Sequence, residues 1–153
     1  MCIRDRVLIT NKDEAGCIKR AESKKIPYKI IRGKDFLQKE AFELEIVNTL
    51  IHYDVELVVM AGWMKIVTPF FINKFKNKII NIHPSLLPSY KGGSAIKDSI
   101  FNGSKITGCS VHFVEEEVDS GSLIMQAALS IRDDDDIESV SYTHLTLPTI
   151  YSV

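Results

Sequence analysis

The stretch that most constrains the fold of this chain runs from Lys78 to Pro88 and reads Lys-Ile-Ile-Asn-Ile-His-Pro-Ser-Leu-Leu-Pro. Its first half is an apolar, β-branched run typical of a buried strand, and its two prolines prevent a sheet ladder or a helix from continuing. A strand is therefore expected to end here with polar groups at its tip.

Two polar residues, Asn81 and His83, are spaced by two along this predicted strand. Side chains two apart on a strand share a face, so we expect these two to project together while Ile80 and Ile82 turn into the packing. A carboxamide donor beside an imidazole suits acyl transfer, in which an oxyanion is held while an amine loses a proton. Taken singly, either residue is more simply a capping asparagine or a histidine bonded to backbone.

Composition narrows the class of protein. With 153 residues, of which 45% are hydrophobic and 25% charged, the chain predicts one soluble domain. The net charge of -1 provides no basic field for nucleic acid or an anionic membrane. Cys2, Cys17 and Cys109 show no pairing pattern, and no apolar run suits a membrane span or a signal peptide. We therefore expect a cytoplasmic protein with small-molecule partners, no nucleic acid and no membrane.

Apolar runs and helical periodicity alternate along the chain. Helices are expected at 16–25 (begun by Asn11 to Glu14), 36–53, 69–75 and 94–102, and strands at 7–10, 27–31, 55–61, 78–82, 106–114 and, as an edge, 122–131. The run Val55 to Ala61 is typical of a central parallel strand covered on both faces. This order predicts an open, mostly parallel α/β sheet that binds its ligand at the carboxyl ends of its strands.

The string from Asn81 to Pro88 resembles the signature of the phosphoribosylglycinamide formyltransferase family, which are folate-dependent enzymes of purine synthesis. The likeness extends to Met60–Val67, Gly108–Val114 and Val118–Gly121 and spans roughly residues 7 to 140. It implies a Rossmann-like sheet of the formyltransferase type, with 10-formyltetrahydrofolate as co-substrate and 5'-phosphoribosylglycinamide as substrate. It further implies no metal, for which no ligand spacing is present, and a monomer or weak homodimer.

The resemblance also implies catalytic roles for three residues. Asn81 would donate to the oxyanion, and His83, supported by Asp119, would move protons as the substrate amine attacks the formyl carbon. Asp119 ends an acidic run, yet its Asp-Ser-Gly turn can point one carboxylate into a cleft, where it would favour imidazolium and fix the ring. His112 is expected to be a packed or hydrogen-bonded structural histidine.

For the co-substrate the resemblance implies contacts from Lys39, Met64, Lys65, Ile66, Val67, Asn81, Glu115, Glu116, Glu117, Val118 and Asp119. From the residues alone, Gly62 to Val67 is an apolar staple between a strand and a helix, Lys39 an exposed helical lysine, and the three glutamates a solvated loop. Lys65 stands where the family often has arginine, which keeps the charge and loses the planar fork.

Both ends of the chain depart from the family pattern. Residues 1–6 and 141–153 resemble translated sequencing-adaptor read-through, so we expect non-native ends around a formyltransferase catalytic domain at 7–140. That domain would be incomplete at both ends, because the family's Gly-rich phosphate loop and C-terminal helix are not recognisable. We expect such a chain to fold poorly and turn over little.

Three alternatives share the central string. Methionyl-tRNA formyltransferase has a similar Asn-x-His-x-Ser-Leu-Leu-Pro motif but carries a tRNA-binding domain. Formyltetrahydrofolate deformylase uses the same three residues with water, although Pro84-Ser85 matches the glycinamide enzyme better. An inactive folate-binding remnant is the non-enzymatic alternative.

Overall fold

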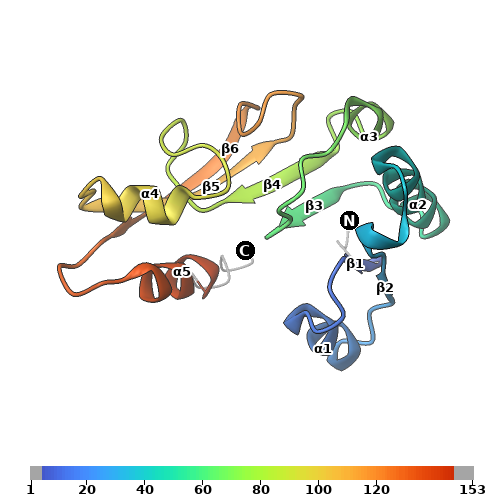
Figure 1. Ribbon diagram of the computed structural model, residues 1–153, viewed down its shortest axis with the longest axis horizontal. Helices are drawn as coiled ribbons and strands as arrows, with labels where there is room; N and C mark the ends of the chain where they lie inside the picture. The colour runs from blue at the N-terminus through green and yellow to red at the C-terminus, as the bar shows by residue number, and fades with distance from the viewer. Residues whose placement is uncertain (1–4, 147–153) are drawn as a thin grey trace. The chain divides into compact units, whose positions relative to one another are not determined.

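The computed structural model of the chain describes residues 5–146, with side chains described through residue 141 (Figure 1). Residues 1–4 and 147–153, which belong to the two expected non-native segments, lie outside the described residues. The chain forms two compact units, one made of the chain up to residue 58 together with 67–76, and the other of 59–66 together with the chain from 77 onward.

The N-terminal unit contains a two-stranded parallel sheet, in which Leu8 pairs with Tyr28 and Thr10 with Ile30. A helix separates the two strands in sequence, as a parallel pair requires. The elements are β1 (Leu8–Thr10), α1 (Gly16–Ser23), β2 (Tyr28–Ile30), a short 3-10 helix η1 (Gly33–Asp35), α2 (Lys39–His52) and α3 (Pro69–Lys74).

Helix α2 supplies much of the core of this unit, burying Phe42, Ile46, Val47 and Leu50. Its Glu43 is only 2% exposed and accepts hydrogen bonds from the Thr68 backbone N–H at 2.9 Å and from the Thr68 hydroxyl. A carboxylate is stabilised at a helix N-terminus, and Thr68 is the N-cap of α3. Glu43 therefore links α2 to the start of α3.

The second unit is built on a four-stranded sheet in the order β3 (Val58–Ala61), β4 (Ile79–His83), β5 (Ile106–Phe113) and β6 (Leu123–Ser130). The β4–β5 pair is antiparallel and so is the β5–β6 pair. Two helices complete the unit, α4 (Ala95–Phe101) and α5 (Ile137–Thr146). Figure 1 shows β4, β5 and β6 side by side, with α4 and α5 beside them.

The predicted α/β fold with open sheets is confirmed, but the β4–β5 and β5–β6 pairs are antiparallel and not parallel. Strand β6 follows β5 through the loop 114–122 without a crossover helix, and only an antiparallel pair permits such a connection. Strand β6 does end the strand order, as predicted for an edge strand.

One burial prediction is wrong, since Ile82 is 39% exposed and does not enter the packing. Strand β3 stands at the other end of the strand order of its four-stranded sheet. An apolar run predicts a strand but does not specify which of its faces another element covers.

The helices differ from the predictions in three respects. Helix α2 begins at Lys39, because Phe36 is extended and packs edge-on against Phe42 with ring centroids 5.7 Å apart. Helix α1 begins at Gly16 as predicted but has no side-chain cap, since Asp13 is engaged by the Arg32 guanidinium instead. Helix α5 was not expected.

A local signal for α5 is present in the sequence. The Asp136 carboxylate accepts a hydrogen bond from the Ser139 N–H at 2.8 Å, which is how an aspartate caps a helix N-terminus. Val140, only 1% exposed, belongs to the core. The acidic run 133–136 therefore leads directly into a helix.

Candidate functional site

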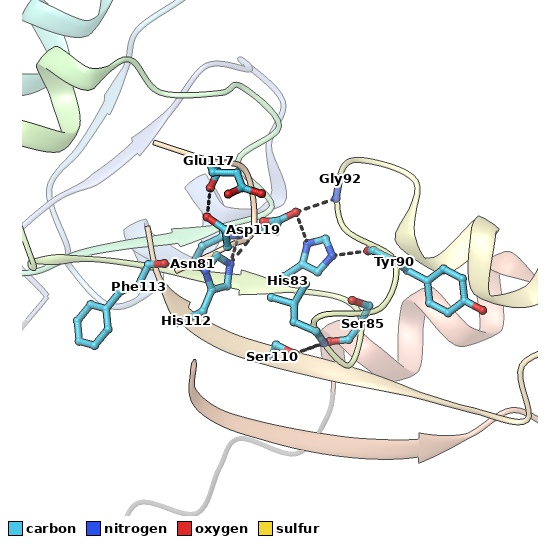
Figure 2. A network of polar contacts seen from close by, with 12 residues as sticks. Asn81, His83, Ser85, Tyr90, Gly92, Ser110, His112, Phe113, Glu117 and Asp119 are labelled. Carbon is cyan, nitrogen blue, oxygen red and sulfur yellow. Dashed lines mark hydrogen bonds and ion pairs between the residues drawn. The ribbon is translucent and has the colours of Figure 1, made fainter. Parts of the chain in front are cut away.

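The candidate site forms where β4 ends. His83, the last residue of β4, is 4% exposed and lies opposite Ser110 in the antiparallel register with β5. Asn81 lies two residues earlier, opposite His112. Figure 2 shows these side chains in one polar network with Asp119. The prediction that Asn81 and His83 share a face agrees with this arrangement.

His83 is held between two acceptors. Its Nδ1 lies 3.3 Å from Oδ2 of Asp119, and its Nε2 donates to the Tyr90 carbonyl oxygen at 2.8 Å. A carbonyl oxygen only accepts, so Nε2 carries a hydrogen, and Nδ1 faces a carboxylate that also accepts when ionised. A doubly protonated ring would donate to both partners, and the two side chains of this contact are only 5% and 9% exposed.

The Asp119 carboxylate is placed by a tight turn at the end of the acidic loop. Asp119 has a φ of +50°, in the left-handed region that aspartate tolerates better than most residues. Its Oδ2 also accepts a hydrogen bond from the Gly92 N–H at 2.8 Å. Two residues later Gly121 packs against β5, where a Cβ would lie 1.9 Å from the Phe113 carbonyl oxygen. The Asp-Ser-Gly sequence thus fits a turn that returns one carboxylate toward His83.

His112 joins the other half of the network. Its Nδ1 donates to the Phe113 carbonyl oxygen at 2.7 Å, so in the neutral ring Nε2 is free to accept from Asn81 Nδ2 at 3.3 Å. The same Nε2 lies 3.5 Å from Oδ1 of Asp119. The prediction of a hydrogen-bonded, packed histidine is confirmed, with an exposed fraction of 2%. Its contact with Asn81 could have been found only from the β4–β5 register, which pairs the two residues.

The loop after His83 is fixed by buried serines. Ser85 and Ser110 are both 0% exposed, and the Ser110 hydroxyl donates to the Ser85 carbonyl oxygen at 2.6 Å. The Ser85 hydroxyl in turn donates to the Ser89 carbonyl oxygen at 2.6 Å, which occupies its only hydrogen. Burial raises the pKa of the Cys109 thiol, which disfavours the thiolate. Neither Ser85 nor Cys109 is arranged as a nucleophile.

The segments expected to contact the co-substrate are largely exposed. Met64 and Ile66 are 72% and 63% exposed, and a Cβ at Gly93 would lie 3.5 Å from the Met64 methyl carbon. Met64 therefore lies beside the loop that bonds His83 and Asp119. Lys65, Glu115, Glu116, Glu117 and Val118 are exposed and Val67 is half-buried, while Lys39 is exposed at the first turn of α2 in the N-terminal unit.

The described residues show few other candidate centres. Within 5–146 no group of three or more His, Cys, Asp or Glu side chains is arranged to hold a metal ion. Two open depressions of about 660 and 380 Å³ on the N-terminal unit are lined by none of the predicted site residues. Among the helices that the structure describes, none has the length and apolar composition needed to cross a bilayer.

Fold and site together define a class: an α/β protein with a carboxamide, an imidazole and a carboxylate gathered at the end of a strand, an arrangement suited to general acid-base chemistry. The formyl transferase family model matches residues 4–147, and the chain belongs to that family.

Within the formyl transferase family, the chain is similar in sequence to proteins of purine biosynthesis. Over 134 residues the chain is 37% identical to the phosphoribosylglycinamide formyltransferase of Bacillus subtilis, covering 88% of this chain and 69% of that protein. It is 43% identical over 141 residues to the trifunctional purine biosynthetic protein adenosine-3 of Chironomus tentans, covering 92% of this chain. The chain spans only 10% of that protein's length and 14% of its Gallus gallus counterpart.

Solved structures show the same similarity at the level of the fold. The crystal structure of phosphoribosylglycinamide formyltransferase from Bacillus halodurans matches with a TM-score of 0.85 at 37% identity, covering 90% of this chain and 71% of that one. The enzyme from Coxiella burnetii, solved in complex with CHES, matches with a TM-score of 0.87 at 37% identity, covering 97% and 71%. The chain is therefore similar to phosphoribosylglycinamide formyltransferases in both sequence and fold.

Proposed function

We propose that the protein transfers the formyl group of 10-formyltetrahydrofolate to the amine of 5'-phosphoribosylglycinamide. The observation that carries the proposal is the ion pair of His83 with Asp119, two strand positions from the Asn81 carboxamide. The similarity to phosphoribosylglycinamide formyltransferases supports this choice of donor and acceptor.

In the proposed mechanism the substrate amine attacks the formyl carbon and a tetrahedral oxyanion forms. The Asn81 NH₂ has two hydrogens, of which one is directed to His112 Nε2, and the second is available to the oxyanion. Imidazolium at His83 then donates a proton to the folate nitrogen as the carbon–nitrogen bond breaks, and the neutral imidazole so formed takes up the proton that the attacking amine loses as the product formamide forms. Asp119 stabilises the charge of that ring throughout, and general acid-base help of this kind contributes roughly 10²- to 10⁴-fold in rate.

The proton must travel through Nε2 of His83, because Nδ1 faces Asp119. Nε2 is bonded to the Tyr90 carbonyl oxygen at 2.8 Å, so the reacting nitrogen has to take the place of that carbonyl. Productive binding therefore breaks the His83–Tyr90 bond locally at Tyr90, a left-handed residue with a φ of +53°, while the His83–Asp119 contact is kept. The exposed Met64 and Ile66 side chains would pack on the pteridine ring, whose edge would bond to backbone groups of residues 64–67.

The test is product formation by the purified chain from 10-formyltetrahydrofolate with three acceptors: 5'-phosphoribosylglycinamide, water and methionyl-tRNA. We expect formylated glycinamide ribonucleotide as the main product, and a fall of about 10²-fold or more in kcat for His83→Gln and Asp119→Asn. The slow turnover expected from the sequence would lower the absolute kcat of every variant but would not change these ratios between variant and unchanged protein.

The acceptors separate the alternatives. Formate release that does not depend on the ribonucleotide would identify a deformylase, and formylated tRNA would identify the tRNA enzyme. Calorimetric folate binding without any product would leave a binding remnant. Unchanged kcat in His83→Gln would refute the mechanism whichever acceptor is used.

A further inference from the structure

One side chain from the edge strand reaches the loop that follows His83. Gln126 on β6 lies opposite Ser110 on β5 in the antiparallel register. Its Nε2 lies 2.9 Å from the Leu87 carbonyl oxygen and 2.9 Å from the Ser110 hydroxyl. An amide nitrogen has two hydrogens, so this one group can satisfy both acceptors.

The number of hydrogens available around Ser110 determines which group donates and which accepts in each hydrogen bond of its hydroxyl. Its single hydroxyl hydrogen goes to the Ser85 carbonyl oxygen at 2.6 Å, since a carbonyl cannot donate. Its two lone pairs then accept from the Leu87 N–H at 3.0 Å and from Gln126. The carboxamide must therefore present its nitrogen, not its oxygen, to the loop. Buried polar groups that are all satisfied in this way hold a single conformation.

The same loop carries the groups that hold the catalytic pair. From Ser85 the hydroxyl bond to the Ser89 carbonyl continues the chain of contacts at 2.6 Å, and the adjacent Tyr90 carbonyl accepts from His83. Two residues further on, the Gly92 N–H donates to Asp119. One end of the loop is thus fastened to β5 and β6, while the other end sets the orientation of His83 and Asp119.

We propose that Gln126 is a positioning residue for formyl transfer, which acts by donating two hydrogen bonds that fasten the loop 84–92 and so align His83 with Asp119. This inference rests on the proposed function, and its effect should fall on kcat rather than on KM. Misplacement of reacting groups by about 1 Å can cost on the order of 10²-fold in rate, so we expect a loss of about 10- to 100-fold when the donor is removed.

The experiment compares Gln126→Glu, Gln126→Met and the matched control Ile124→Ala with the unchanged protein. Glutamate has the shape of glutamine but, when ionised, no hydrogen to donate, while methionine keeps the apolar bulk. Ile124 lies two positions earlier on the same strand, is 48% exposed and makes no bond to the loop in the described structure. The kcat and KM for formyl transfer are measured from about pH 5 to pH 8, each relative to the unchanged protein at the same pH.

The pH profile separates positioning from a general loss of structure. In Gln126→Glu the relative kcat should rise as the pH falls, because a protonated carboxyl regains one donor, while Gln126→Met should stay low at every pH. Ile124→Ala should keep kcat and KM. A flat ratio for Gln126→Glu, or equal losses in Ile124→Ala, would overturn the proposal.

A second readout does not need turnover. The ring ¹⁵N signals of His83, assigned by comparison with His83→Gln, should move in both Gln126 variants and stay in place in Ile124→Ala. If the unchanged protein shows no formyl transfer, the proposed function is refuted. The His83 ring ¹⁵N signals would still show whether Gln126 positions the His83 side chain. Unmoved His83 signals in Gln126→Met would refute that role even if the enzyme is active.

Discussion

Replacing Gly121 with alanine should uncouple the carboxylate from the imidazole. The new Cβ would lie 1.9 Å from the Phe113 carbonyl oxygen and 2.8 Å from its carbonyl carbon, both backbone atoms of β5. Because non-bonded contacts of this kind settle near about 3.5 Å, the turn and the strand must separate by roughly 1.5 Å. The Gly92 N–H to Asp119 bond, now 2.8 Å, does not survive a shift of that size.

We therefore expect Gly121→Ala to lose about 10²-fold in kcat and, as overpacking does, about 1 to 3 kcal/mol in the free energy of unfolding. The assays are formyl transfer and urea denaturation. Gly16→Ala is the matched control, since a Cβ at this exposed first residue of α1 meets nothing within 4 Å and alanine favours a helix. A Gly121→Ala protein with kcat within about twofold of the parent would refute the geometric reasoning.

Three further predictions concern stability and reactivity. Thr107 is 3% exposed and its hydroxyl has no hydrogen-bond partner among the described residues, so Thr107→Val should raise the free energy of unfolding by about 1 kcal/mol in urea titrations. Because burial raises the pKa of Cys109, its alkylation by iodoacetamide at about pH 8 should be slower in the folded than in the urea-unfolded chain, as mass spectrometry would show, and equal rates would count against this. The hydrogen bond and charge of Lys105 lower the pKa of Asp133, so the stability they add is present above the unfolded pKa and declines as the pH falls through the lower folded pKa. Since both side chains are exposed, Asp133→Asn should weaken the acid dependence only slightly, and a difference that persists in high salt would contradict a screened surface pair.

The arrangement at the end of β4 was predictable because it depends on local rules. The alternation of side chains along a strand placed Asn81 and His83 together, and two prolines ended the strand at that point. The placement of Asp119 depended on the family resemblance, since an acidic run by itself predicts a solvated loop. The positive φ of Asp119 and the close contact of Gly121 give the physical basis for that turn.

Strand pairing could not be obtained in the same way. An apolar run such as 55–61 predicts a strand, but its neighbours and their direction depend on contacts far apart in sequence. This is why the antiparallel direction of β5 and the exposure of Ile82 were missed. The same limit hid the contacts of His112 with Asn81 and of Gln126 with Ser110, which follow from the registers of β4 with β5 and of β5 with β6.

The antiparallel pairing also explains why the site needs few loops to assemble. Asn81 faces His112 and His83 faces Ser110 across one pair of strands, so two residue pairs on the same face of the ladder, separated by the Ile82–Val111 pair, bring four of the network's side chains together. Asp119 then places one oxygen near each histidine, 3.3 Å from His83 Nδ1 and 3.5 Å from His112 Nε2. If both rings were protonated, Asn81 Nδ2 would lose its acceptor on His112. In the proposed mechanism, Asn81 is therefore oriented best toward the oxyanion when His83 alone carries the extra proton, which it would then give to the leaving group.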